Sequence, residues 1–253
     1  MTALLKTEGL CKRFGSVRAV DGVDLEVREG QLTAVIGPNG AGKTTLFHLV
    51  TGAIAPDAGR VHFAGRDITG WPPAAIVRAG LARTFQITSV FPELSALENV
   101  LLPVLAQRRE TARLWGSYAG HPARDAALEL LDRVGLVAQA HRPCGQLSHA
   151  DQKLVEVAMA LATRPRLLLL DEPAAGLAPG ETERVIGSLR DMVAAGGVTV
   201  VLIEHDMDIV FSMADRIVVL HQGRVLADGT PSEIRANPAV KEVYLGGTFA
   251  GRP

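Results

Sequence analysis

The stretch GPNGAGKTT at residues 37–45 follows a short apolar run at residues 31–36. Apolar residues at helical spacing, Leu46, Leu49 and Val50, come directly after it. This order predicts a strand, a glycine-rich loop and a helix. The letters fit the pattern G-x-x-x-x-G-K-[S/T], in which backbone N–H groups and a helix N-terminus surround phosphate groups. The stretch therefore predicts an α/β fold of the phosphate-loop class.

Different residues of this loop serve different parts of a nucleoside triphosphate. Gly37, Gly40 and Gly42 let the backbone approach the phosphates closely. Lys43 places a positive charge near the β- and γ-phosphates, and Thr44 offers a hydroxyl to magnesium. A coincidental glycine turn is the alternative, and the flanking strand and helix disfavour it. The predicted ATP-binding residues of the loop are Gly37, Asn39, Gly40, Ala41, Gly42, Lys43, Thr44 and Thr45.

A second stretch, LLLLDEP at residues 167–173, reads as a buried strand that ends in two carboxylates. Adjacent side chains at a strand end point in different directions, so one carboxylate can serve the metal while the other meets water. We assign Asp171 to magnesium and Glu172 to the catalytic base. A strand-end turn with a helix cap is the alternative, and the phosphate loop disfavours it. Together the two stretches predict magnesium-dependent hydrolysis of ATP.

The rest of the chain fits one domain over residues 1–253 with an insertion. Apolar runs at residues 198–203 and 216–220 predict further strands of a mixed, largely parallel sheet. Residues 225–229 complete a hairpin with Gly223 in its turn, and residues 232–244 are predicted to be helical. The predicted RecA-like core comprises residues 1–88 and 160–253, with an N-terminal antiparallel β subdomain. The predicted inserted helical subdomain comprises residues 89–159.

Composition excludes several classes of function. A net charge of −1 over 253 residues gives no bulk attraction to nucleic acid. Cys11 and Cys144 lack C-x-x-C spacing and fit a reducing compartment, although a single disulfide stays open. No uncharged apolar run reaches the length that spans a bilayer, and we expect no cleavable signal at the N-terminus. Any association with a membrane should therefore come through a partner.

The order of these motifs resembles the ATP-binding cassette ATPases over essentially the whole chain. In that resemblance Phe14 matches the aromatic residue that stacks on adenine, and Gln86 matches the glutamine that joins the metal site to the helical subdomain. His205 matches the histidine that faces the γ-phosphate and takes part in catalysis. The residues matching the family signature are Ser148, His149, Ala150, Asp151 and Gln152. Those matching the loop at the dimer interface are Ala175, Gly176 and Leu177.

The resemblance implies a mechanism that no single motif displays. Two subunits close head to tail over two ATP molecules, so that each nucleotide lies between one phosphate loop and the signature of the other subunit. Hydrolysis removes the γ-phosphate contacts and reopens the dimer. The motion passes to membrane-spanning partners that dock near Gln86 and residues 87–94. The resemblance does not decide between a homodimer and pairing with a related ATPase.

Finer features resemble the bacterial importers of branched-chain amino acids, urea and short amides. The segments that carry this likeness are residues 65–70, 82–86, 91–94, 97–100, 174–177, 203–207 and 244–246. The likeness implies two membrane-spanning permease subunits, a periplasmic or extracellular substrate-binding protein, and a peripheral place on the cytoplasmic face of the bacterial inner membrane. The cargo is not contacted by this subunit, and branched-chain amino acids are the leading expectation. A lipopolysaccharide-export ATPase and a regulatory subunit with weak hydrolysis are the alternatives.

Two positions depart from the family signature, and the second carries the expectation. Most members carry two glycines where this chain has His149 and Ala150. An alanine keeps its N–H group but adds a methyl group and disfavours positive φ, which would crowd the approach to the partner's nucleotide. We therefore expect Ala150→Gly to raise the ATPase rate or to tighten ATP-dependent dimerisation.

Overall fold

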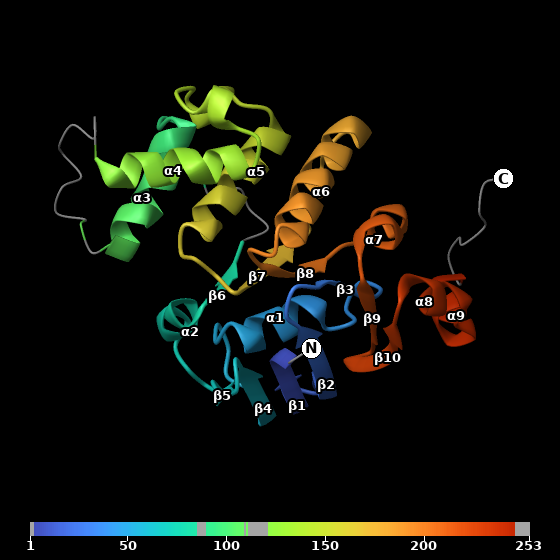
Figure 1. Ribbon diagram of the computed structural model, residues 1–253. Coiled ribbons are helices and arrows are strands. Elements are labelled where there is room, and N and C mark those ends of the chain that lie inside the picture. The colour runs from blue at the N-terminus through green and yellow to red at the C-terminus, as the bar shows by residue number, and fades with distance from the viewer. Residues whose placement is uncertain (1–2, 85–89, 109, 111–120, 246–253) are drawn as a thin grey trace. The chain divides into compact units, whose positions relative to one another are not determined.

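The computed structural model describes residues 3–84, 90–108, 110 and 121–245 (Figure 1). The chain divides into two compact units. Unit 1 comprises Met1–Ile76 and Thr199–Pro253, and unit 2 comprises Val77–Val198. The phosphate loop belongs to unit 1, whereas the carboxylate pair and the signature belong to unit 2.

Unit 1 contains an antiparallel sheet with the strand order β2-β1-β4-β5. Its strands are β1 (Ala3–Phe14), β2 (Val17–Arg28), β4 (Ala58–Phe63) and β5 (Arg66–Asp67). Alternate residues of β2 are buried, namely Val23, Leu25 and Val27, as a half-covered sheet requires. The predicted N-terminal antiparallel subdomain is confirmed.

The parallel strands of unit 1 place the phosphate loop. β3 (Leu32–Ile36) pairs in parallel with β8 (Thr199–Ile203) and with β9 (Arg216–His221). Every residue of β3 and β8 is buried, which explains their continuous apolar sequences. β10 (Arg224–Gly229) returns antiparallel to β9, and the hairpin predicted around Gly223 is confirmed. The loop thus starts at the carboxyl end of a central strand.

The helices of unit 1 are α1 (Lys43–Val50), α2 (Pro73–Ala79), which runs across the unit boundary, α7 (Met207–Met213), α8 (Pro231–Ala236) and α9 (Pro238–Leu245). The helical character predicted at residues 232–244 is confirmed and belongs to two helices. Asn237 is the C-cap of α8, and Pro238, which lacks a backbone N–H group, is the first residue of α9.

Unit 2 combines a short parallel strand pair with helices (Figure 1). β6 (Leu81–Arg83) pairs in parallel with β7 (Leu167–Asp171). The longer helices are α3 (Ala96–Arg108), α4 (Pro122–Arg133), α5 (His149–Leu161) and α6 (Pro179–Ala194). Two 3₁₀ turns, η2 (Val137–Gln139) and η3 (Cys144–Gln146), lie between α4 and α5. The insertion predicted at residues 89–159 lies within this unit and stays a prediction as a separate subdomain.

The core of unit 2 forms where α3, α4 and α5 pack together, with Leu105, Leu131 and Leu154 buried. Asn99 is fully buried there, and its Nδ2 donates to the backbone oxygens of Phe91, Leu94 and Ser95. A buried amide must have its hydrogen bonds satisfied, so Asn99 ties the segment before α3 to the helix. Within the described part of the chain, no helix is long and apolar enough to cross a membrane.

Candidate nucleotide-binding site

The phosphate loop connects β3 to α1, and the side chain of Lys43 donates hydrogen bonds to the backbone of this loop. Lys43 is only 6% exposed, and its Nζ donates to the backbone oxygens of Gly37 at 2.7 Å and Pro38 at 3.1 Å. Asn39 and Gly40 at the top of the loop are exposed, as is Thr44 in the first turn of α1. The first turn of α1 contains no acidic residue, and the positive end of the helix dipole there suits an anion. Thr45 is half-buried beside it, and Ala41 is buried.

The turn between β9 and β10 is hydrogen-bonded to this loop, a contact that the sequence did not reveal. The Gly223 N–H donates to the Ala41 oxygen at 3.0 Å, and the Asp21 N–H donates to the Gly223 oxygen at 2.8 Å. These two bonds join β2, the hairpin turn and the loop. The hydrophobic pattern identified the hairpin, but nothing in it could show that the turn contacts the loop.

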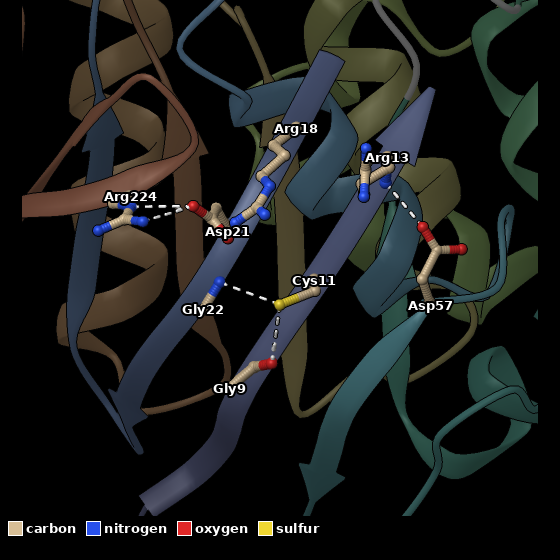
Figure 2. Close-up of polar contacts among 8 residues, drawn as sticks. All are labelled: Gly9, Cys11, Arg13, Arg18, Asp21, Gly22, Asp57 and Arg224. Atoms are coloured by element: carbon tan, nitrogen blue, oxygen red, sulfur yellow. Dashed lines mark hydrogen bonds and ion pairs between the residues drawn. The ribbon is translucent and has the colours of Figure 1, made fainter. Parts of the chain in front are cut away.

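Ion pairs reinforce the same junction (Figure 2). The Arg224 guanidinium donates through Nε and Nη2 to one carboxylate oxygen of Asp21, at 3.0 and 2.7 Å. Arg18 approaches the other oxygen at 3.2 Å. The hydrogen bond from Arg224 is the main reason that the pKa of Asp21 lies below its usual value. Asp21 is therefore charged at neutral pH and can hold the hairpin against β2.

The aromatic residue predicted to stack on adenine lies at the exposed end of β1. Phe14 is 51% exposed, which is unusual for so large an apolar side chain. Asp57 fixes the chain just before it, since its carboxylate accepts from the Arg13 N–H at 2.7 Å and from Lys12 Nζ at 2.8 Å (Figure 2 shows the Arg13 contact). Lys12 Nζ also lies 5.8 Å from the centre of the Phe14 ring. An open, anchored ring suits stacking on a flat base.

Gly42 is a position where no side chain fits. Its φ is 104°, and a Cβ atom there would overlap the backbone oxygen of Ala19. We expect Gly42→Ala to lower the free energy of unfolding by roughly 1–3 kcal/mol or more and to distort the loop. Urea denaturation of the nucleotide-free protein measures the loss. Gly30→Ala is the matched control, because Gly30 has a φ of 75° and a Cβ atom there would meet no other atom within 4 Å. Equal losses in both variants would contradict the steric explanation.

His205 follows β8 in unit 1. It is exposed, and its N–H donates to the Glu204 carboxylate at 3.2 Å, where Glu204 itself is buried. Asp206 then caps α7 by accepting from the N–H groups of Asp208 and Ile209. The histidine thus lies between a buried strand and a capped helix.

In unit 2 the carboxylate pair ends strand β7. Asp171 is 3% exposed, and its Oδ2 lies 2.6 Å from Nη2 of Arg83. Glu172 is half-buried and has a φ of 51°, a left-handed conformation that is uncommon for residues other than glycine. Strand β7 ends at Asp171 and Glu172 lies in the turn after it, so alternation along a strand does not describe this pair. Such local strain is frequent at functional sites.

The oxygen atoms predicted to bind magnesium are of the kind that this ion prefers. Mg²⁺ takes carboxylate and hydroxyl oxygens together with phosphate oxygens and water. The Asp171 carboxylate is buried and charge-paired, and the Thr44 hydroxyl is exposed at the start of α1. The donor set therefore fits the ion. The third predicted ligand, Gln86, and part of the predicted docking segment at residues 87–94 lie outside the described residues.

The signature residues form the N-terminus of α5 in unit 2. Ser148 is the N-cap, and its Oγ accepts from the Asp151 N–H at 3.2 Å. The Asp151 carboxylate pairs with Arg184 of α6 at 2.9 Å, a contact that the sequence did not reveal. The Gln152 amide donates to the oxygens of Cys144 and Leu147. These two side chains therefore shape the signature, while exposed His149 faces solvent.

Ala150 does not have the conformation on which the expectation of crowding was based. It lies inside α5 without positive φ, and its side chain is fully buried. The methyl group therefore packs within unit 2 and does not project from the surface. The structure removes the physical reason for expecting weak hydrolysis from this residue.

We now expect Ala150→Gly to destabilise the protein without raising the ATPase rate. The free energy of unfolding should fall by up to about 1 kcal/mol because glycine has lower helix propensity, and by about 0.8 kcal/mol because a buried methyl group is lost. Denaturant unfolding checks this value, with Ala106→Gly at an exposed position of α3 as the matched control. A higher ATPase rate in Ala150→Gly would contradict this account and would support crowding of the nucleotide by Ala150.

The predicted interface loop follows Glu172 directly. Ala175 and Gly176 are exposed, Leu177 is half-buried, and Gly176 has a φ of 77°. Two turn bonds hold the loop, from the Ala175 N–H to the Glu172 oxygen and from the Leu177 N–H to the Ala174 oxygen. The loop is therefore tied to the backbone of the predicted base.

Comparison with known proteins decides the family. The family model described as ABC transporter matches residues 20–175, which include the phosphate loop, the signature and the carboxylate pair. The chain belongs to the ABC transporter family. A second model, described as branched-chain amino acid ATP-binding cassette transporter, matches residues 224–250 of this cassette.

Relatives resemble the cassette over nearly their whole length. The high-affinity branched-chain amino acid transport ATP-binding protein BraF of Pseudomonas aeruginosa is 44% identical over 252 residues, covering 96% of this chain and 98% of the relative. LivG of Escherichia coli K12, with the same description, is 40% identical over 250 residues and has the same coverage. Among solved structures, the ADP conformation of MJ1267, an ATP-binding cassette of an ABC transporter, is 33% identical with a TM-score of 0.86, covering 98% of this chain and 100% of that one.

Proposed function

We propose that this cassette is the ATP-hydrolysing subunit that powers an importer of branched-chain amino acids. The observation that carries the proposal is the 40–44% identity, end to end, to ATP-binding proteins of high-affinity branched-chain amino acid transport. The match of residues 224–250 to a branched-chain amino acid cassette model supports it independently of the common motifs.

In the proposed reaction, each predicted residue acts on one part of ATP. Phe14 stacks on adenine, while the loop N–H groups and Lys43 bind the phosphates. Asp171, Thr44 and Gln86 would hold the magnesium ion, which neutralises charge on the phosphate oxygens. Glu172 accepts a proton from water as the water oxygen attacks the γ-phosphorus. The bond to the β–γ bridging oxygen breaks, and His205 stabilises the γ-phosphate.

We propose that the signature acts in trans on the nucleotide of a second subunit. Ser148 and the first turn of α5 present N–H groups at a helix N-terminus, which suits a phosphate. The loop at Ala175 and Gly176, which is exposed, would contact the second subunit. A structural neighbour, the dimeric post-hydrolysis cassette MJ0796 bound to ADP and phosphate, is 27% identical with a TM-score of 0.74 and supports this pairing. The second subunit is either a copy of this chain or a related ATPase.

The proposed partners are two membrane-spanning permease subunits and, through them, an external substrate-binding protein. The cassette would then lie on the cytoplasmic face of the bacterial inner membrane as a peripheral subunit. The permeases would dock near Gln86 and residues 87–94, which carry the motion of the nucleotide site to the membrane.

Affinity purification from detergent-solubilised membranes of the source cells tests these partners. Tagged Glu172→Gln protein with Mg-ATP is expected to retain two multi-spanning permeases, and a second cassette if the dimer is mixed. Lys43→Ala protein purified in parallel should still bind the permeases, because docking does not use the phosphate loop. Recovery of lipopolysaccharide bridge proteins, or of no membrane protein at all, would contradict the proposal.

A further inference from the structure

A buried ion pair connects the predicted magnesium ligand to the strand that leads toward Gln86. The side chains of Arg83 and Asp171 are 9% and 3% exposed, and their closest nitrogen and oxygen lie 2.6 Å apart. Lys153 and Glu156 form another ion pair in which both side chains are deeply buried. A buried pair needs good geometry to offset the loss of hydration, so Arg83 is held in a defined position.

Strand pairing fixes the geometry of this contact. Arg83 lies opposite Leu169 in the parallel register of β6 and β7, and the Thr84 N–H donates to the Leu169 oxygen at 3.0 Å. Asp171 is two residues beyond Leu169 and therefore on the same face of β7. The guanidinium reaches forward along the strand to the carboxylate. The backbone on both sides of the contact is thus part of one hydrogen-bonded ladder.

Helix α5, which begins with the signature, contributes charged side chains close to Asp171. A cavity of about 10 Å³, which has room for about one water molecule, is lined by Asp171 together with Thr84, Lys153, Glu156, Val157, Leu170, Pro173 and Val185. Lys153 and Glu156 come from α5 and lie 3.8 Å apart. They are 8% and 7% exposed. Asp171 therefore belongs to a buried charged cluster built from β6, β7 and α5.

We propose that Arg83 is a positioning residue that holds one carboxylate oxygen of Asp171 and leaves the other for the metal ion. The inference rests on the proposed function, because it concerns the metal site of ATP hydrolysis. Oδ2 of Asp171 is bound by the guanidinium, so Oδ1 is the oxygen that remains for a metal. A carboxylate ligand is oriented by such outer hydrogen bonds, and their removal typically costs 10–100-fold in metal affinity. Arg83 also connects Asp171 to the start of the segment that contains Gln86.

The test measures how much a metal ion improves nucleotide binding. Mn²⁺ replaces Mg²⁺ because its electron paramagnetic resonance reports the bound ion directly. The affinity for the non-hydrolysable analogue AMP-PNP is measured with Mn²⁺ and with EDTA in the wild-type protein, in Arg83→Gln and in Arg83→Lys. The gain from Mn²⁺ is the affinity for AMP-PNP with Mn²⁺ divided by the affinity with EDTA. We expect this ratio to fall by about 10–100-fold in Arg83→Gln and by less in Arg83→Lys. Affinity in EDTA should not change, because Lys43 and the phosphate loop are untouched.

Two controls separate positioning from loss of fold. Arg216→Gln removes another arginine from a carboxylate, since Arg216 donates to Asp228 at 2.6 and 2.7 Å, and it should not alter the gain from Mn²⁺. Asp171→Asn should lose the gain, and adding Arg83→Gln to it should cause little further loss, because the two residues act as a unit.

Each outcome decides between positioning and another role. An unchanged or larger gain from Mn²⁺ in Arg83→Gln would overturn the inference and make Arg83 a competitor of the metal. Failure of both Arg83 variants to fold would also overturn it, because Arg83 would then serve the fold. If wild-type protein shows no gain from Mn²⁺, the proposed function itself fails. That result is distinct from an effect of Arg83.

Discussion

Replacing Lys43 by alanine is expected to weaken ATP binding by about 100-fold or more. Hydrogen bonds to charged groups contribute roughly 1.5–3 kcal/mol each, and the lysine can donate several to the β- and γ-phosphates. Lys43 also binds the oxygens of Gly37 and Pro38, so its loss should loosen the loop that it spans. Both effects lower the affinity for ATP.

Isothermal titration calorimetry with Mg-ATP measures this change. Lys241→Ala is the matched control, because Lys241 is an exposed lysine of α9 in the same unit. The control should bind ATP like the wild-type protein. Normal ATP affinity in Lys43→Ala would show that the loop is not the phosphate site.

Glu172→Gln is expected to bind ATP normally and to lose most of its turnover. A positioned general base contributes about 10²–10⁴-fold to the rate, and the amide cannot accept the proton from water. Glutamine has nearly the same shape, so it should tolerate the left-handed backbone at this position as glutamate does. The fold and the Asp171–Arg83 pair should therefore persist.

Release of phosphate from Mg-ATP measures turnover, and nucleotide titration measures binding. Glu183→Gln is the matched control, since Glu183 is exposed on α6 and has no predicted role. The control should hydrolyse ATP at the wild-type rate. Unchanged hydrolysis in Glu172→Gln would remove Glu172 from the mechanism.

The sequence predicted the parallel strands β3, β7 and β8, because all their residues are buried. β3 ends directly before Gly37, where the phosphate loop begins, and β7 ends at Asp171, the predicted metal ligand. Ser148 is the N-cap of α5, a position that its residue type favours. Such features depend on neighbours in the sequence and can be read without a structure.

Contacts between distant segments could not be predicted in the same way. Arg83 meets Asp171 across 88 positions of sequence, and Gly223, in the turn between β9 and β10, meets Ala41 of the phosphate loop. No periodicity encodes either contact. The reading of Ala150 was wrong for a similar reason, since the direction of its methyl group depends on the helix packing of unit 2.

The most direct test of the central claim is uptake of radiolabelled leucine into proteoliposomes. They would contain this cassette, the permeases and any second cassette that purify with it, and would be given the external binding protein. With Mg-ATP on the cassette side, the wild-type complex is expected to accumulate leucine, and complexes containing Lys43→Ala or Glu172→Gln are expected not to. Leucine uptake that needs no ATP, or that is unchanged by both substitutions, would contradict an importer powered by this chain.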